Sequence, residues 1–406
     1  MGKKILFSLL SGMFFLFLLS SAFAAEPVKI GALLTLTGPL AEAGQEHKHA
    51  IGLAVEHINK KGGIKSLGGA LIQIVYGDSQ AKTDVAVSEV TRLAEKEKVI
   101  AIIDMYPSVV TIAASGEAEK VKVPFYAGIS AATEITNRGF KYIFQQDPIV
   151  REMSRNFVNF IDFLGKFVGR KLEAVVTLGD TTSYPATAIE EGKKFLAERG
   201  YKILASLTYP INATDVSVQI GKIKALNPDI VYSVGYLGDG ILIEKTADRM
   251  GIESLILDGS GKAHTKWLEM CPKNEGEFTQ NFWGRDVSPK ANELFGEYKA
   301  GSGKVMTGHS ALMYQGMIVL AQALEISRSY ERDDLRKALQ KIEILPGEYL
   351  IMPYDRIKFN ENGLNIGGDF IFSQIQNCDF VTVFPDKFAS KKIKMTPKLE
   401  KLKQKK

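Results

Sequence analysis

The chain has 406 residues, of which 45% are hydrophobic and 24% charged, and its formal net charge is +5. About 380 residues beyond the amino-terminal segment exceed what one ordinary hydrophobic core holds, so the length predicts two lobes. Residues 391–406 carry eight lysines against Glu400, a net charge of +7, and Lys3 and Lys4 add +2, which leaves −4 for the body of the chain. A mildly acidic body argues against a nucleic-acid-binding protein, which needs Lys and Arg clustered on one element of the fold.

The start of the chain has the pattern of a secretory signal peptide, expected at residues 1–24. Two lysines precede a largely apolar stretch at residues 5–19, and Ala22 and Ala24 are the small residues that a signal peptidase needs. A retained anchor helix is the alternative, but the apolar stretch is short for a membrane span. No cysteine lies near the expected cleavage point after Ala24. The segment therefore predicts a protein released into the periplasm, and not a lipoprotein.

Two cysteines, Cys271 and Cys378, lie in the second half of the chain. In an oxidising compartment a disulfide can persist, which favours a bridge between them. Their separation in sequence does not say whether their Cα atoms come within the ~7 Å that a disulfide requires.

Short apolar runs alternate with longer segments of helical period, which is typical of strands and crossover helices in a parallel sheet. In the helix expected at residues 45–60, apolar residues recur at positions i, i+3, i+4 and i+7. The first series of expected elements comprises strands at residues 28–34, 71–76, 99–103 and 124–126 and helices at 45–60, 83–95 and 109–121. The second comprises a helix from Ile149, strands at 172–176, 202–207 and 230–234, and helices at 186–199 and 216–226. Helices at residues 310–324 and 333–339 are expected to return to the first lobe.

An enzyme should show a constellation of catalytic residues, and the sequence shows none. Three of the five histidines, His47, His49 and His57, project in different directions from one expected helix, so they cannot converge on a metal. Residues 259–262 and 301–304 resemble the end of a phosphate loop, but they lack the earlier glycine and the following Ser or Thr. We therefore expect no catalytic residue, no metal and no cofactor; turnover of a bound solute would revive the alternative of a periplasmic enzyme.

Several motifs follow one another along nearly the whole chain after the signal peptide. They are IGALLTLTGPLAEAG at residues 30–44, GLAVEHINKKGGI at 52–64, VIAIIDMYPSVVTIAAS at 99–115 and VPFYAGISAATEIT at 123–136. In this order they resemble the type I periplasmic binding proteins of the leucine, isoleucine and valine receptor kind.

This resemblance implies an α/β fold with two Rossmann-like lobes, joined by three crossing strands, with the ligand in the cleft between the lobes. The crossing strands are expected near residues 145–147, 279–281 and 352–354. The first lobe would comprise residues 26–145 and 280–351, and the second residues 146–279 and 352–390.

Ser108 is the first candidate ligand-binding residue, because ligands of doubly wound sheets settle beyond the carboxyl ends of the strands. It follows the strand expected to end at Ile103 and opens the next helix. Its hydroxyl and the free N–H groups of that first turn can hold a carboxylate without a cationic side chain. The resemblance implies this same contact; a simple N-cap is the alternative role, and both can coexist.

Four further candidates come from the resemblance. Ala131 and Thr133 match the loop that completes the site for the ligand's α-carboxylate and amine, although the chain is two residues shorter immediately afterwards. Tyr184 and Tyr236 match the aromatic residues of the second lobe that cover the ligand on closure, where a ring supplies apolar area and a phenol; a pair of core tyrosines is the alternative.

The chain departs from this family where the ligand itself is recognised. Ser260 stands where the amino-acid-binding members place a carboxylate for the ligand's ammonium, and Asp258 is the nearest substitute. A buried ammonium without an anion would cost several kcal/mol. Ala43 replaces an aromatic residue, and His309 falls near a position that lines the ligand's side chain. These changes suggest a wider or more polar pocket than one for leucine, isoleucine or valine.

The resemblance implies a solute-binding receptor of an ABC importer that binds a small carboxylate-bearing ligand, such as a branched-chain or related amino acid. We expect a monomer that delivers this ligand to the permease subunits in the inner membrane and binds no nucleic acid. A receptor for aromatic carboxylates or small amides, and a sensory protein built on the same lobes, are the alternatives.

Residues 391–406 are expected to form a solvated, partly frayed basic end. A weak attraction to anionic lipid is the alternative role for this tail. We expect a chain truncated after Ser390 to bind its ligand normally, because the tail would lie outside both lobes.

Overall fold

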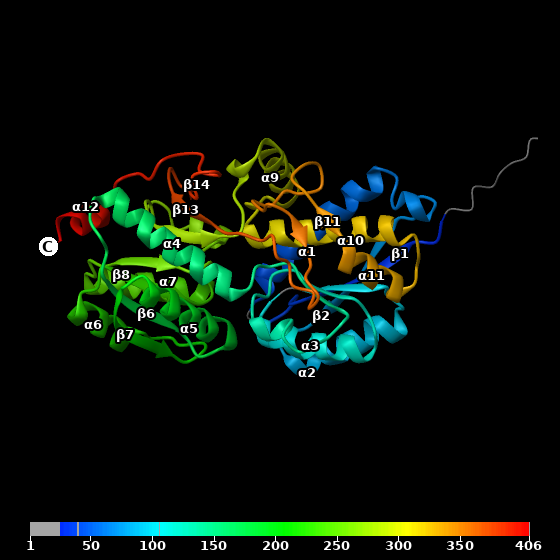
Figure 1. Ribbon diagram of the computed structural model, residues 1–406, viewed down its shortest axis with the longest axis horizontal. Coiled ribbons are helices and arrows are strands. Elements are labelled where there is room, and N and C mark those ends of the chain that lie inside the picture. The colour runs from blue at the N-terminus through cyan, green and yellow to red at the C-terminus, as the bar shows by residue number, and fades with distance from the viewer. Residues whose placement is uncertain (1–24, 39, 105, 406) are drawn as a thin grey trace, which may run out of the picture.

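The computed structural model describes residues 25–38, 40–104 and 106–405, so the expected signal peptide lies outside the described residues. Two lobes lie side by side along the long axis of the molecule (Figure 1), each built on one sheet. Among the described residues, no helix has the length and apolar character that crossing a membrane requires.

The first lobe contains a sheet of five parallel strands in the order β2-β1-β3-β4-β5. Its strands are β1 (Val28–Leu34), β2 (Ile72–Asp78), β3 (Ala101–Asp104), β4 (Phe125–Ala127) and β5 (Ile143–Gln145). Between them run α1 (Ala41–Lys60), η1 (Lys65–Leu67), α2 (Thr83–Thr91), η2 (Arg92–Lys96), α3 (Ser108–Lys120) and η3 (Thr133–Ile135). The apolar strands β1, β3 and β4 are almost completely buried, as expected for a parallel sheet covered on both faces.

Later segments of the chain return to the first lobe. They include α9 (Pro289–Ser302), α10 (Gly308–Ser327), α11 (Arg332–Lys341) and the two-stranded sheet of β11 (Glu343–Ile344) and β12 (Ile357–Lys358). α10 packs along α1, where the Nδ1 of His57 lies 2.8 Å from the hydroxyl of Tyr314. The predicted return of two helices to this lobe is confirmed.

The second lobe contains a seven-stranded sheet in the order β14-β13-β10-β9-β8-β6-β7. Its strands are β6 (Ala174–Asp180), β7 (Lys202–Tyr209), β8 (Ile230–Val234), β9 (Leu255–Asp258), β10 (Phe278–Asn281), β13 (Ile371–Ile375) and β14 (Phe380–Phe384). Its helices are α4 (Val150–Val168), α5 (Ser183–Glu198), α6 (Ser217–Leu226), α7 (Leu237–Met250), α8 (Thr265–Leu268) and α12 (Pro397–Gln404), and η4 (Arg285–Val287) contacts β14. The pairs from β10 to β7 are parallel, whereas β13 and β14 are antiparallel additions.

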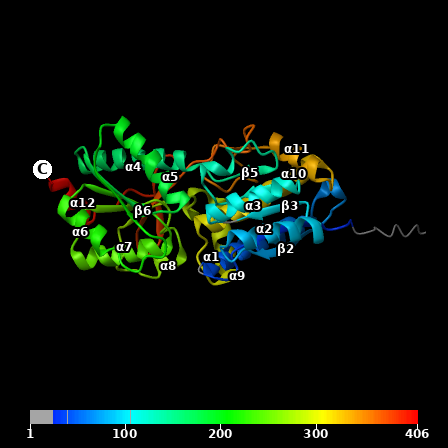
Figure 2. The same ribbon diagram turned by 90° about the horizontal axis from the view of Figure 1, so that it is seen from below.

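The chain passes between the two sheets three times, first between β5 and α4 and next after β10. The third passage lies later than residues 352–354, because Leu364 still bridges to Gln145 at the edge of the first sheet and the next strand begins only at Ile371. The lobes also meet directly, since α3 of the first contacts α5 of the second (Figure 2).

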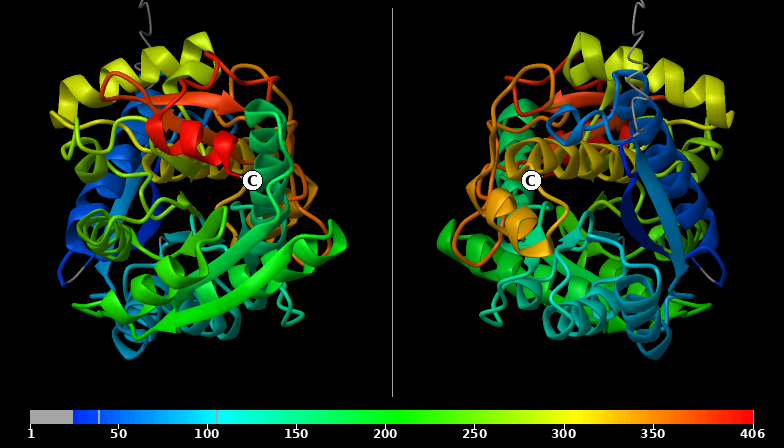
Figure 3. Two further views of the ribbon diagram at one scale, coloured as in Figure 1. Left: turned by 90° about the vertical axis from the view of Figure 1, so that its left-hand side faces the viewer. Right: turned by 90° about the vertical axis from the view of Figure 1, so that its right-hand side faces the viewer.

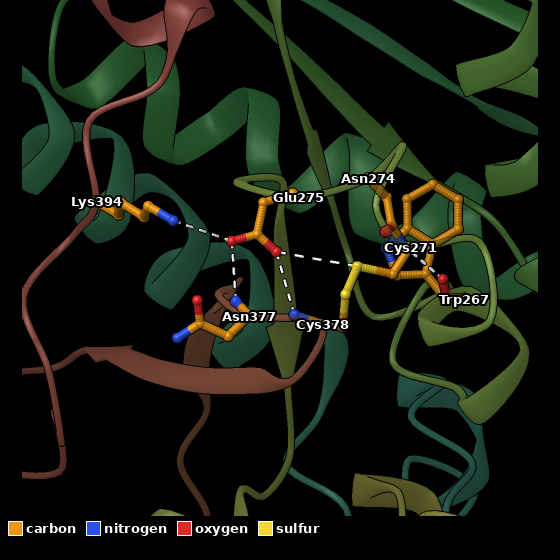
Figure 4. The surroundings of a disulfide bond; sticks show 7 residues. All are labelled: Trp267, Cys271, Asn274, Glu275, Asn377, Cys378 and Lys394. Carbon is orange, nitrogen blue, oxygen red and sulfur yellow. Dashed lines mark hydrogen bonds and ion pairs between the residues drawn. A yellow bond between two sulfur atoms is a disulfide. The ribbon is translucent and has the colours of Figure 1, made fainter.

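The disulfide that the sequence favoured is present between Cys271 and Cys378, whose Cα atoms lie 5.6 Å apart. It ties the segment after α8 to the turn between β13 and β14 (Figure 4). Beside it, the carboxylate of Glu275 accepts the backbone N–H groups of Asn377 and Cys378 at 2.9 and 3.1 Å. The bridge therefore fastens the two antiparallel strands to the parallel part of the second sheet.

The carboxyl-terminal segment is not a frayed, solvated end, and that prediction is wrong. Its last helix, α12, packs against α4 and β9 (Figure 3), with Leu399 and Leu402 buried. The guanidinium of Arg170 donates to the carbonyl of Leu402 at 2.8 Å. The lysines alternate with apolar residues at helical spacing, so one face of the segment is buried while most of its charges remain in solvent.

A substitution in α12 tests this packing. We expect Leu399→Ala to lower the free energy of unfolding by about 2–5 kcal/mol, the range for removing a fully buried leucine side chain. Lys403→Ala, on the exposed face of the same helix, should change it by no more than about 0.5 kcal/mol. Urea unfolding followed by circular dichroism measures both, and truncation after Ser390 should destabilise at least as much as Leu399→Ala. Equal stabilities of the three variants would contradict the packing.

Candidate ligand-binding cavity

A cavity of about 230 Å³ lies between the lobes, where the carboxyl ends of their parallel strands face each other. The first lobe lines it with residues from the start of α1, the start of α3, the loop after β4 and the start of α10. The second lobe lines it with residues from the starts of α5 and α7 and from the loop after β9.

Six of the eight residues predicted from the sequence line this cavity. They are Ser108, Ala131, Tyr184, Tyr236, Ser260 and His309. The other two, Thr133 and Asp258, do not line it. The fold therefore brings together residues that are as much as 201 positions apart in the chain.

Ser108 is the first residue of α3, and Pro107 occupies the N-cap position. Ser108 is buried and lies one position past the N-cap, so the alternative role of a simple N-cap does not apply. One turn further, the hydroxyl of Thr111 donates to Asp104 at 2.5 Å and lies 2.7 Å from the hydroxyl of Ser130. These contacts hold the first turn of α3, with its free N–H groups, at the cavity wall.

Ala131 lies in the loop after β4, and its carbonyl accepts the backbone N–H of Val150 at 3.0 Å. This bond ties the cavity wall to the first residue of α4, directly after the passage between the lobes. Thr133 is the first residue of the short helix η3. It is half-buried and does not line the cavity. Ser130, the residue directly before Ala131, also lines the cavity, although it was not among the residues predicted from the sequence.

Tyr184 and Ser260 meet at the wall of the second lobe. The Tyr184 hydroxyl donates to the carbonyl of Gly259 at 2.6 Å and lies 3.0 Å from the hydroxyl of Ser260. Ser260 has a φ of +73°, a left-handed conformation that a serine adopts only when its surroundings hold it there. A Cβ atom on Gly261 would lie 2.6 Å from the carbonyl oxygen of Gly235, so the loop also needs glycine at that position.

Asp258 does not line this wall, and one oxygen of its carboxylate, Oδ2, already has two donors. It accepts the backbone N–H of Lys262 at 2.8 Å and the hydroxyl of Thr279 at 2.9 Å. The buried ammonium of Lys262 forms ion pairs with Glu244 and Glu277. The geometry thus gives Asp258 a structural role in the loop after β9, outside the lining of the cavity.

Aromatic rings from both lobes approach one another at the cavity. The ring centroids of Tyr106 and Tyr236 lie 6.3 Å apart with an interplanar angle of 25°, and those of Tyr184 and Tyr236 lie 6.0 Å apart. Burial raises the pKa of Tyr184 and Tyr236 above the ordinary value for tyrosine. Both therefore stay protonated at neutral pH, and the one O–H of Tyr184 is the donor to Gly259.

Three histidines gather at one side of the cavity. The ring centroid of His309 lies 5.0 Å from that of His264 and 6.2 Å from that of His47. Burial lowers the pKa of His47 to about 3 and that of His309 well below its ordinary value, with smaller contributions from the neighbouring histidines. His47 and His309 are therefore neutral. Among the described residues, the one cluster of possible metal ligands contains the two disulfide cysteines and none of these histidines.

Two buried acids of the cavity wall were missed in the sequence. One Oε atom of Glu46 lies 3.7 Å from the ammonium of Lys304 and the other lies 3.9 Å from the Nδ1 of His264. Asp147 is fully buried, and burial raises its pKa well above the ordinary value for aspartate. The sequence could have indicated Asp147 as a candidate, because it is a charged residue inside a segment already expected to cross between the lobes.

Two doubly wound lobes with a cavity between the ends of their parallel strands define a binding protein with a cleft for a solute. A family model described as periplasmic binding protein matches residues 27–378, and the chain belongs to this family. The resemblance inferred from the motifs is confirmed, and so is the type I fold with two lobes. The family consists of binding proteins, which supports the prediction that the chain is not an enzyme.

One curated relative and two solved structures of similar fold illustrate what the chain is similar to. Leu/Ile/Val-binding protein homolog 7 of Brucella suis is 28% identical over 395 residues, which cover 93% of this chain and 96% of that protein. The leucine binding protein LivK of Thermotoga maritima has a TM-score of 0.77 at 24% identity and covers 88% of this chain and 98% of its own. A solute binding protein of an ABC transporter from R. palustris in complex with benzoate has a TM-score of 0.76 at 16% identity and covers 88% of this chain and 95% of its own.

The neutral state of His47 makes stability depend on pH. Its pKa is about 3 in the folded protein against 6.5 for the ordinary side chain, so between these values the unfolded chain binds one proton more. The free energy of unfolding that His47 contributes should therefore fall as the pH drops below 6.5, by roughly 2 kcal/mol at pH 5. Because Asp147 titrates with the opposite sign, the measured quantity is the difference between the parent protein and His47→Gln at pH 7.5, 6 and 5.

His57→Gln, a substitution on the same helix outside the cavity, is the matched control for this comparison. A difference between the parent protein and His47→Gln that stays constant over the three pH values would contradict a neutral, buried His47.

Proposed function

We propose that the chain is the extracytoplasmic solute-binding receptor of an ABC importer, which binds a small carboxylate-bearing ligand, an amino acid of the branched-chain or related kind. The observation that carries this proposal is the start of α3, where the buried Ser108 lines an interlobe cavity one position past the N-cap. The N–H groups and the hydroxyl there suit a carboxylate, because the positive end of the helix dipole favours an anion.

The other wall residues complete the proposed site. Ala131 would present its backbone beside Ser108, and Tyr184 and Tyr236 would cover the ligand from the second lobe. Ser260 and His309 would face the rest of the ligand, as a hydroxyl and a neutral imidazole. We propose that the lobes close on the ligand by a hinge motion at the three passages between the sheets.

The names of the relatives support this function. The Brucella suis and Thermotoga maritima proteins carry the names of branched-chain amino acid receptors. By this analogy the chain would act as a monomer in the periplasm, after cleavage of residues 1–24, and deliver its ligand to permease subunits in the inner membrane. A sensory receptor would use the same lobes and the same cavity.

One observation favours aromatic carboxylates as the second candidate ligands. Aromatic side chains form much of the cavity wall, from Tyr106 and Phe282 to Tyr184 and Tyr236. Such rings can pack against the ring of an aromatic acid. The R. palustris protein of the same fold binds benzoate.

Ser108→Ala tests the placement of the carboxylate. We expect it to weaken binding of a carboxylate ligand by about 1–3 kcal/mol, or roughly 5- to 150-fold, because a buried polar partner is lost. Isothermal titration calorimetry with L-leucine, L-isoleucine, L-phenylalanine and benzoate measures the effect. Ser88→Ala, an exposed serine on α2, is the matched control. An unchanged affinity for the acid that binds the parent protein would place the carboxylate elsewhere.

A further inference from the structure

Asp147 occupies a rigid position at the passage from the first lobe to the second. It follows β5 by two residues, and the side chain of the preceding Gln146 is fixed by two hydrogen bonds. The Tyr126 hydroxyl donates to its amide oxygen at 2.7 Å, and its amide nitrogen donates to the carbonyl of Leu312 at 3.0 Å. The backbone carbonyl of Gln146 accepts the side-chain amide of Asn365 at 3.0 Å. Three hydrogen bonds thus hold Gln146, the residue directly before Asp147.

The carboxylate of Asp147 is fully buried, lines the cavity, and lacks a protein partner. Neither of its oxygen atoms has a hydrogen-bond partner among the described residues, and no lysine, arginine or histidine of that part lies within ion-pair distance. A buried polar group in this state is costly unless something else satisfies it. Burial raises its pKa, and no neighbouring cation opposes that shift.

The rest of the cavity wall also favours a positive group over a second negative one. Glu46 is buried in the same wall, and its Oε2 atom has no hydrogen-bond partner among the described residues. Lys266 lines the cavity with its positive charge, but its side chain is half exposed and forms an ion pair with Glu42. The faces of Tyr106, Tyr184 and Tyr236 carry the negative side of the ring quadrupole, which attracts a cation.

We propose that Asp147 receives the positively charged nitrogen of the ligand, so that the cavity binds a small zwitterionic amino acid between Ser108 and Asp147. The carboxylate half of this inference rests on the proposed function; the amine half rests on Asp147 alone. The anion that the resemblance places at the position of Ser260 is thereby supplied from the first lobe, at the hinge. Ligand binding then supplies a partner to a carboxyl group that has none among the described residues.

Three matched sets of probes test the proposal. They are L-phenylalanine, 3-phenylpropanoate and phenethylamine; L-leucine, 4-methylpentanoate and 3-methylbutylamine; and the remaining common amino acids with their deamino acids. Thermal shift screening followed by calorimetry should show that amino acids bind the parent protein and that the matching deamino acids bind at least about 10-fold more weakly. This comparison needs no variant, so it decides the question even if a variant fails to fold.

Asp147→Asn removes the charge and keeps the shape. We expect it to weaken binding of the amino acid by about 10-fold or more while changing the affinity for the deamino acid by far less. Asp84→Asn, an exposed aspartate on α2, is the matched control and should leave both affinities as they are. Ser108→Ala, in contrast, should weaken both probes, because both carry the carboxylate.

Each remaining outcome is decisive. Tighter binding of the deamino acids than of the amino acids would mean that a protonated Asp147 donates to a carboxylate, and it overturns the proposal. Equal binding of the amino acid by Asp147→Asn and the parent protein overturns it, as does a screen in which no amine-bearing probe binds. Binding of the amines without the acids would leave the role of Asp147 standing while the proposed carboxylate receptor fails.

Discussion

The parallel arrangement of strands in both sheets determines where this protein can hold a solute. Parallel strands end at one edge, and the helices that follow them begin at that edge with free N–H groups. Here the two edges face each other, so the starts of α3, α5 and α7 all reach one cavity. Polar recognition can therefore come from backbone and hydroxyl groups, and neutral side chains suffice at the positions where the ligand's carboxylate would lie.

Two kinds of buried charge occur close to that cavity, and they differ in how they are compensated. Behind the wall, Lys262 lies between Glu244 and Glu277, and Asp258 accepts two hydrogen bonds. These contacts compensate the buried charges and hold the loop after β9. In the wall, Asp147 has no such partner among the described residues. A buried carboxyl group without a hydrogen-bond partner is costly, and burial raises its pKa, which is why it points to a group that arrives from outside.

The carboxyl-terminal helix α12 takes part in the same network of buried ion pairs. Lys398 of α12 lies 3.4 Å from Glu277 and 3.8 Å from Glu244, so the last segment of the chain adds a second cation to the network of Lys262. The network in turn contacts the residues that hold Ser260 at the cavity. A segment far from the ligand thus helps to position the wall of the second lobe through buried ion pairs.

The sequence by itself determined the fold class, most of the strands of both lobes and six residues of the cavity wall, because apolar periodicity and motif order are local properties. β1 and β8 have the predicted bounds, and Ser108 opens its helix as expected. Only the tertiary structure decided the rest. Whether Asp258 or Asp147 faces the cavity depends on which groups fold against each carboxylate, and whether the lysine-rich end frays depends on the packing of α12 against α4 and β9. These are contacts between distant segments, and no local pattern encodes them.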